Sequence, residues 1–262
     1  MTLPALFIGH GTPMNAIAEN PFAPVWRALG ERLPRPEKIL AVSAHWETDG
    51  LAATAMEKPR TIHDFYGFPQ ALFDMQYPAP GDPALVERLR ELLAPEPVAA
   101  DQEWGLDHGT WSVLCHLYPE ADIPVVQFGL DMGLSPETHL AIGKALSPLR
   151  DEGVMIIGLG NVVHNLRAMI RAPDAPAYAW AERFDAAIRA GVEAHDDTVL
   201  TGYEGLGEDA RLSVPRAEHY LPLLYPMGAR RPGETVEVLT PVIDLASTSM
   251  TSYVIGAPER LI

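Results

Sequence analysis

Apolar residues in this chain gather in short runs that are separated by longer amphipathic segments. Three of the runs are continuous rather than alternating, as expected for strands whose two faces are both buried. Val154–Leu159 is the most hydrophobic of the runs. Strands are predicted over Leu3–Ile8, Lys38–Ser43, Ile123–Phe128, Val154–Leu159, Thr235–Leu239 and Ser252–Ile255.

The segments between these runs carry apolar residues at helical spacing. Leu85, Leu89 and Leu92 form one apolar stripe, and Pro83 suits the first turn of that helix. Helices are predicted over Pro24–Leu33, Pro83–Leu93, Ser135–Leu149 and Ala179–His195. Strands buried on both faces and alternating with helices predict an α/β fold. We expect residues 1–262 to form a single three-layer domain, with a mostly parallel central sheet and helices on both faces.

Three histidines fall at or just past the carboxyl ends of predicted strands. His10 follows Leu3–Ile8, His45 follows Lys38–Ser43, and His164 follows Val154–Leu159. Ligands of parallel sheets bind beyond the carboxyl ends of the strands, so these imidazoles could converge on one metal ion. The spacing matches no metal motif such as H-E-x-x-H, and each histidine could instead satisfy a loop carbonyl.

Two further histidines have suggestive neighbours. His108 follows Asp107 and lies in a segment, interpreted as a loop, that is flanked by two tryptophans. The aspartate could orient the imidazole and the tryptophans could wall a flat substrate pocket, although a packed aromatic loop would look the same. Glu218 and His219 open a predicted short helix, on which neighbours point about 100° apart. Only one of the two is therefore expected to face the crevice.

Three other histidines and the single cysteine are interpreted as structural residues rather than as site residues. His139 and His195 lie on predicted helices among charged residues, and we expect both at the surface. His116 and Cys115 share an apolar stretch. A core or helix-edge position is expected for the histidine and a small core position for the cysteine.

The composition narrows the classes of function. Lys and Arg number 19 against 35 Asp and Glu, which gives a net charge of −16. Nucleic acid and anionic membranes repel such a chain, so neither is an expected partner. The single cysteine excludes an internal disulfide and any multi-cysteine metal site, and a reducing cytoplasm is the expected location. No G-x-G-x-x-G, G-x-x-x-x-G-K-[ST] or G-x-S-x-G motif occurs, which disfavours nucleotide-driven and serine-hydrolase chemistry.

Five segments of the chain together resemble a known family. They are Gly9–Met14, Ser43–Trp46, Asp107–Gly109, Gly160–Leu166 and Glu218–Leu223. In this order they are similar to the 4,5-DOPA dioxygenase group of the class III extradiol ring-cleavage dioxygenases, to which the catalytic subunit of protocatechuate 4,5-dioxygenase is related. The match runs from Leu3 to about Gly256.

The resemblance implies a non-haem metal centre that opens a catechol ring beside its two hydroxyl groups and inserts both atoms of dioxygen. His10, His45 and His219 would be metal ligands. His164 would be a fourth ligand or an acid–base residue, and His108 the other acid–base residue. The protocatechuate branch supplies a glutamate as third ligand, whereas this chain resembles the group that uses His219.

The remaining expectations concern the metal and the substrate. Iron(II) would support dioxygenase activity, and a set of histidine ligands also suits zinc(II), which could fill the site on purification. His63, Trp46 and Asn161 are predicted to contact the small aromatic catechol, with His63 on a long loop that could cover a pocket. Two alternatives stay open: a zinc-dependent hydrolase on the same histidines, and a non-catalytic metal-binding relative.

Overall fold

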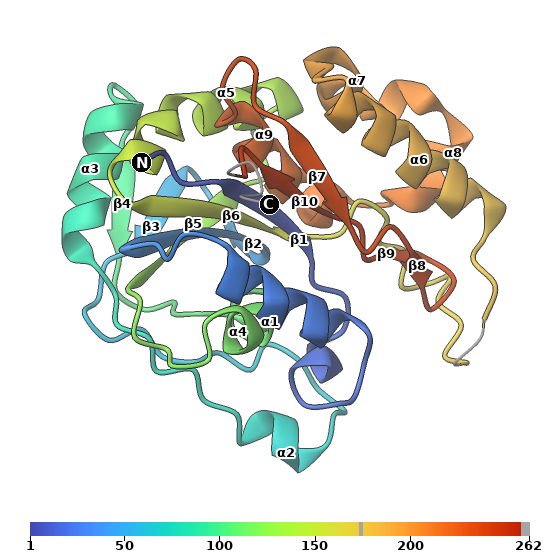
Figure 1. Cartoon of the computed structure of the whole chain (residues 1–262), viewed down its shortest axis with the longest axis horizontal. Coiled ribbons are helices and arrows are strands. Elements are labelled where there is room, and N and C mark those ends of the chain that lie inside the picture. Colours follow the sequence, from blue (N-terminus) through green and yellow to red (C-terminus); the bar gives the residue numbers. More distant parts are fainter. Residues whose placement is uncertain (173–174, 258–262) are drawn as a thin grey trace.

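The computed structural model describes residues 1–172 and 175–257, and its centre is an eight-stranded sheet (Figure 1). From one edge to the other the strands are β4 (Val98–Asp101), β3 (Leu51–Thr54), β5 (Val125–Asp131), β2 (Lys38–Thr48), β6 (Val154–Gly160), β1 (Ala5–Gly9), β10 (Ser252–Ile255) and β7 (Val236–Leu239). The central strands β5, β2, β6 and β1 are parallel. The antiparallel pairs, β3 with β5, β1 with β10 and β10 with β7, lie toward the edges. The carboxyl ends of the four central strands therefore share one edge of the sheet.

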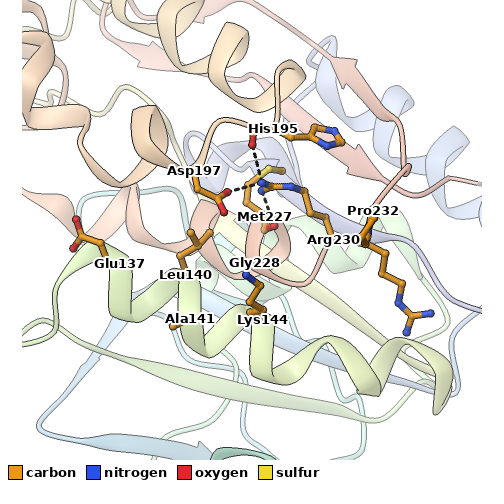
Figure 2. A pocket seen from close by; sticks show the side chains of 11 residues that line it. Glu137, Leu140, Ala141, Lys144, His195, Asp197, Met227, Gly228, Arg230 and Pro232 are labelled. Carbon is orange, nitrogen blue, oxygen red and sulfur yellow. Dashed lines mark hydrogen bonds and ion pairs between the residues drawn. The ribbon is translucent and has the colours of Figure 1, made fainter.

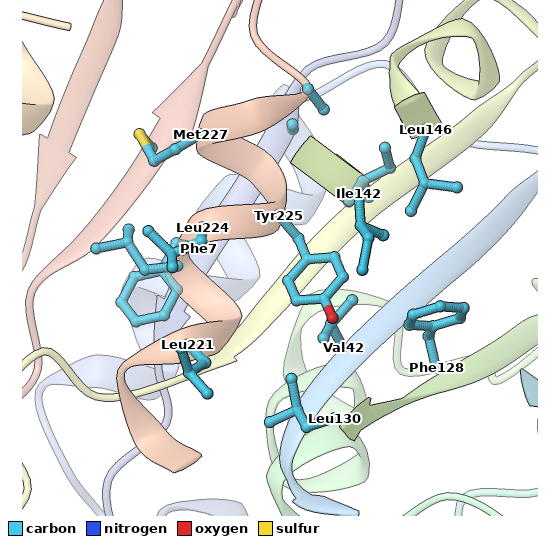
Figure 3. Packing of buried hydrophobic residues seen from close by; sticks show 14 of the residues in the cluster. Phe7, Val42, Phe128, Leu130, Ile142, Leu146, Leu221, Leu224, Tyr225 and Met227 are labelled. Carbon is cyan, nitrogen blue, oxygen red and sulfur yellow. The ribbon is translucent and has the colours of Figure 1, made fainter. Parts of the chain in front are cut away.

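Helices cover both faces of this sheet, because each buried strand presents apolar side chains to both sides. In β1, Ala5 and Phe7 pack in one hydrophobic cluster, and Leu6 and Ile8 in the other. The first cluster is covered by α3 (Pro83–Leu93), α5 (Pro136–Leu146), α6 (Ala179–Glu193) and α9 (Leu224–Gly228), and the second by α1 (Phe22–Arg32) and α4 (His108–Leu117). Figure 3 shows the first cluster around Phe7, with α9 packed beside α5. The predicted three-layer α/β fold is thus confirmed.

Shorter elements complete the chain. They are the helices α2 (Gln70–Phe73), α7 (Asp197–Thr201) and α8 (Glu208–Ser213), a small sheet of β8 (Ile243–Asp244) and β9 (Thr248–Ser249), and 3-10 turns at Pro13–Ala16, Ser147–Asp151, Tyr203–Leu206, Ala217–His219 and Leu221–Leu223. Within the described ranges, no helix has the length and apolar character needed to cross a bilayer.

All the predicted strands and helices form, with ends that shift by a few residues. The helix predicted at Pro83–Leu93 has those bounds, and the one predicted from Ser135 continues past Leu146 as a 3-10 turn. The sequence prediction missed β3, β4 and α4, and also the short elements α2, α7, α8, β8 and β9. The segment of α4 was interpreted as a loop, but the Asp107 carboxylate accepts from the backbone N–H of Thr110 at 3.1 Å and caps a helix there.

One of the two surface expectations was wrong. His139 is fully buried, because α5 packs against α9 and the imidazole Nδ1 meets the Tyr225 hydroxyl at 3.0 Å. His195 lies beyond the end of α6, is half-buried and has a positive φ of 56°. Cys115 is half-buried rather than in the core, and His116 has the expected helix-edge position on α4, where its Nε2 meets the Asn15 carbonyl at 2.8 Å.

A cavity of about 390 Å³ lies between α5 and α9 and beside the start of α7 (Figure 2). Arg230 is held at it by the Asp197 carboxylate and by the carbonyls of Met227 and His195, at 2.5, 2.9 and 3.0 Å. These bonds connect α9 to the segment that follows α6. None of the cavity's lining residues is among the predicted site residues.

Candidate metal centre and active site

Three histidines reach one place from separate elements. His10 follows β1 directly, and its backbone N–H donates to the Gly160 carbonyl at 3.1 Å. His45 lies inside β2, where the pairing with β5 changes register between Val42 and Glu47. Such an irregularity re-aims side chains at a strand end. His219 ends the 3-10 turn Ala217–His219.

Gly160 makes room for the turn that carries His219. A Cβ atom at position 160 would lie 2.2 Å from the carbonyl oxygen of His219, so any other residue would push the turn away. The next residue, Asn161, donates its backbone N–H to that same carbonyl at 2.8 Å. The end of β6 therefore sets the position of His219.

The three imidazoles face one another. Ring centroids are 5.2 Å apart for His10 and His45, 5.4 Å for His10 and His219, and 5.0 Å for His45 and His219. One nitrogen from each ring lies within 4.8 Å of the other two. The Nε2 atoms of all three are buried and have no hydrogen-bond partner among the described residues. Buried nitrogens that converge in this way fit a metal ion, because otherwise their desolvation would be uncompensated.

The opposite nitrogen of each ring has an oxygen neighbour. Nδ1 of His10 lies 3.0 Å from the Gly11 carbonyl, Nδ1 of His45 lies 3.4 Å from Asp64 Oδ2, and Nδ1 of His219 lies 3.0 Å from Glu218 Oε1. An acceptor at Nδ1 keeps the proton there and leaves the lone pair on Nε2. The tautomers inferred from these partners thus suit metal binding at Nε2.

Burial favours the neutral form of the three rings. It lowers the pKa of His10, His45 and His219 well below the usual 6.5, and the neighbouring imidazoles lower each pKa further. Neutral imidazole is the form that coordinates a metal. The cluster therefore presents three neutral nitrogen donors near neutral pH.

His108 is the first residue of α4 rather than part of a loop. Its backbone N–H donates to Asp64 Oδ1 at 3.0 Å, and its ring Nδ1 lies 2.9 Å from the same oxygen. Its ring centroid is 3.9 Å from that of His45 and 5.6 Å from the edge-on ring of Phe65. His108 therefore borders the three-histidine cluster and an aromatic side chain at once.

The Asp107 carboxylate has other partners. Oδ1 accepts from the Ser43 hydroxyl at 2.7 Å as well as from the Thr110 N–H, and Oδ2 accepts from the Gln127 amide. Burial and the negative charge of Asp64 raise the pKa of Asp107 to about 6. Asp107 thus fixes the start of α4 against β2 and β5, and Asp64 lies where the neighbouring aspartate was expected to orient His108.

His164 lies beside His219. Their rings stack with centroids 3.4 Å apart at 15°, and His164, Glu218 and His219 form a second group of clustered ligand atoms. Burial lowers the pKa of His164 to about 4. Glu218 lies on the Nδ1 side of the His219 ring. The roles of His164, as ligand or as acid–base residue, stay predictions.

The predicted substrate contacts have different surroundings in the structure. The His63 ring packs against Phe73 and Trp111, and its Nε2 donates to the Met75 carbonyl at 2.9 Å. Trp46 is buried and stacks on Trp104 at 5.7 Å.

Asn161 is the third of these residues. It donates its amide to the Ser249 carbonyl at 2.7 Å, while its buried Oδ1 has no partner among the described residues. Substrate contact by His63, Trp46 and Asn161 stays a prediction.

Asp64 is the site residue that sequence reasoning missed. It lies next to His63 in the predicted loop, but nothing in the spacing of the chain connects residue 64 with residues 45 and 108. Burial acts to raise the pKa of Asp64, and its bonds to His108 outweigh this effect, so the pKa is lowered and the carboxylate is charged. A carboxylate therefore lies between two imidazoles of the site.

Comparisons with known proteins extend over nearly the whole chain. Residues 4–255 match the family described as the catalytic LigB subunit of aromatic ring-opening dioxygenase. A 4,5-DOPA dioxygenase extradiol from Escherichia coli (strain K12) is 49% identical over 97% of this chain and 95% of that protein. The 4,5-DOPA dioxygenase extradiol of Beta vulgaris is 38% identical over 94% of each chain.

A solved structure gives the same result. The crystal structure of an uncharacterized protein from Escherichia coli K12 aligns with a TM-score of 0.85 and 44% identity, and the alignment covers 97% of this chain and 100% of that one. The resemblance drawn from the sequence motifs is confirmed.

Proposed function

Because this chain belongs to the family of the catalytic LigB subunit of aromatic ring-opening dioxygenases, we propose that it opens the ring of a small, DOPA-like catechol at an iron(II) centre. The chain is an extradiol dioxygenase, an oxidoreductase that cleaves aromatic rings. The proposal adds the metal, its ligands and the class of substrate. Relatives named for 4,5-DOPA support a catechol that carries a short side chain.

The observation that carries the proposal is the convergence of three Nε2 atoms, on His10, His45 and His219, that have no partner within residues 1–172 and 175–257. We assign these residues as the metal ligands. Three neutral donors would leave other coordination positions of a bound ion open, which suits a non-haem iron(II) oxygenase. When bound, the iron would supply the redox chemistry that joins dioxygen to the catechol.

His108 is the proposed acid–base residue. With Asp64 at Nδ1, Nε2 is the ring atom left to take a proton from a catechol hydroxyl and to return it later. Phe65, whose ring lies 5.6 Å from that of His108 and 6.2 Å from that of Trp111, gives the site an aromatic wall. Such a wall favours a flat aromatic substrate.

The scope of the proposal is the whole chain. We assign residues 1–262 to one catalytic domain, with a catechol and dioxygen as its small-molecule partners. The net charge of −16 argues against nucleic acid and anionic membranes, and the single cysteine suits a reducing cytoplasm.

Anaerobic reconstitution tests this function. The purified protein is loaded with iron(II), mixed with a panel of catechols that includes DOPA, and exposed to oxygen while oxygen uptake and ring-fission absorbance are followed. We expect one dioxygen consumed for each ring opened with iron, and none in a matched zinc-loaded sample. Full iron occupancy without oxygen uptake on any catechol would contradict the proposal.

A further inference from the structure

We propose that Asp64 is a positioning residue shared by two imidazoles, and that it orients His45 for the metal and His108 for proton transfer. The inference rests on the proposed function for its His108 part. Its His45 part concerns metal affinity alone and can be tested without turnover.

The contacts of Asp64 are divided between its two carboxylate oxygens. Oδ1 lies 2.9 Å from Nδ1 of His108 and accepts the His108 backbone N–H at 3.0 Å. Oδ2 lies 3.4 Å from Nδ1 of His45. The side chain is 18% exposed, so these contacts are largely shielded from water and salt. One carboxylate thus faces the same ring atom of two histidines.

The start of α4 explains why the carboxylate stays in place. The first backbone N–H groups of a helix have no partner within the helix and carry partial positive charge. Asp107 caps the N–H of Thr110, and Asp64 takes the N–H of His108. Asp64 is therefore fixed to the backbone of the residue whose ring it orients.

The loop that carries Asp64 is held on both sides. His63 is bonded to the Met75 carbonyl at 2.9 Å, and its ring lies 5.6 Å from that of Trp111. Phe65 contacts the rings of Phe68 and Phe73 at 5.3 and 5.0 Å. These contacts hold the loop in place, so the Asp64 carboxylate stays directed at the two imidazoles and does not turn toward solvent.

The consequence of this arrangement is a choice of tautomer for both rings. The two Nδ1 contacts, at 3.4 Å for His45 and 2.9 Å for His108, are charge contacts and not well-aligned hydrogen bonds. The negative charge beside Nδ1 still favours a proton on that atom, which leaves the Nε2 lone pair of His45 for the metal and that of His108 for the substrate. Without the carboxylate, either ring can turn or carry its proton on Nε2. Metal affinity and turnover should then fall together, through two different residues.

The first test measures metal affinity without substrate. Asp64→Asn keeps the size of the side chain and removes its charge, and Asp74→Asn is the matched control, because Asp74 is an exposed acid of the same segment whose Oδ1 accepts from Gln70 at 2.8 Å. Zinc is titrated against a competing chelator. We expect about 10–100-fold weaker zinc binding for Asp64→Asn, and wild-type binding for Asp74→Asn. Unchanged zinc affinity in Asp64→Asn would contradict the His45 part.

The second test is a double-mutant cycle in catechol turnover at saturating iron(II). Asp64→Asn alone should lower kcat by about 10–100-fold with a smaller change in KM. In a His108→Phe background the same substitution should leave kcat unchanged, because the ring it orients is gone. Equal losses of kcat in both backgrounds would show that Asp64 does not act through His108.

Two further measurements keep the outcomes separate. Thermal unfolding of the metal-free proteins checks that Asp64→Asn folds. If Asp64→Asn does not fold, both tests use Asp64→Glu instead, which keeps the negative charge and moves it by one methylene. Asp64→Glu should recover part of the zinc affinity, and affinity no better than for Asp64→Asn would argue against an anionic contact. If the wild type opens no catechol, the proposed function fails, and the zinc titration still decides the His45 part.

Discussion

Two regions of this protein bury histidine imidazoles, and they differ in what surrounds the free ring nitrogen. Just past β1 and inside the carboxyl-terminal half of β2, His10 and His45 meet His219, and none of the three Nε2 atoms has a partner among the described residues. Between α5 and α9, His139 is fully buried and its Nε2 also has no partner in the part of the chain that the structure describes, while Nδ1 meets the Tyr225 hydroxyl. Burial lowers the pKa of His139 to about 4, so it too is neutral near pH 7.

The difference teaches that burial and an unpartnered nitrogen do not by themselves indicate a metal site. His139 belongs to no cluster of three ligand atoms within residues 1–172 and 175–257. Its imidazole meets Tyr225, which packs with Ile142 and Phe128 in the apolar cluster shown in Figure 3. Convergence of donors from separate elements is what distinguishes the first region.

The largest expected effect comes from removing a proposed ligand. His10→Ala or His219→Ala should weaken zinc binding by about 10³–10⁴-fold, because each takes on the order of a third of the metal-binding free energy with it. His139→Gln should bind zinc like the wild type. Competition titration of the purified proteins measures all three, and full occupancy in the ligand variants would remove the distinction between the two regions.

The next effect in size is expected for His108, which borders the cluster without belonging to the three-histidine set. His108→Phe should keep the metal and still bind catechol, while kcat falls by about 10²–10⁴-fold. Metal content is measured beside turnover on the same sample. Metal loss in proportion to the loss of activity would make His108 a ligand rather than a base.

Protonation of the buried His139 should change the free energy of unfolding rather than the catalytic activity. Its pKa is about 4 in the folded state because of burial, which the charge of Asp131 partly offsets, against 6.5 in the unfolded chain. The unfolded state binds the proton first, so the free energy of unfolding should fall as pH drops from 6.5 to 4 and level off below. The contribution is about 3 kcal/mol.

Urea unfolding across this pH range measures that contribution. His139→Gln should flatten the pH dependence by the same amount, since glutamine can still bond the Tyr225 hydroxyl but does not titrate in this range. The histidine cluster titrates in both proteins and cancels in the difference. An identical pH dependence in wild type and variant would mean that His139 is not held neutral by the fold.

The smallest effect is expected at Glu218, which touches the Nδ1 side of His219. Glu218→Gln retains an acceptor oxygen at that atom, so zinc binding should weaken by about tenfold, the lower end for outer partners of a ligand. His219→Ala, titrated in parallel, shows how much zinc affinity is lost when a ligand itself is removed. A loss as large as that of His219→Ala would identify Glu218 as a ligand and change the set to two histidines and a carboxylate.

Local pattern determined the elements of this protein and the edge at which its chemistry lies. Continuous apolar runs predicted the central strands, and Pro83 at its first turn placed the start of α3 correctly. His10 could be assigned to the site from sequence because a parallel sheet brings the carboxyl ends of its strands together whatever the details of packing. The segments Asp107–Gly109 and Glu218–Leu223 indicated the family for another reason: the order of motifs along the chain can be compared without knowing where they lie in space.

Only the tertiary structure decided which nitrogen of each ring is free, and what lies opposite it. Asp64 and His108 are 44 residues apart, and no periodicity relates them; their contact exists because a loop packs its aromatic residues on α4. The burial of His139 likewise depends on Tyr225 of α9, which comes 86 residues later. The pattern that marks a helix or a strand lies in neighbouring residues, whereas the desolvation and the partners of a polar side chain are set by whichever distant segment packs against it.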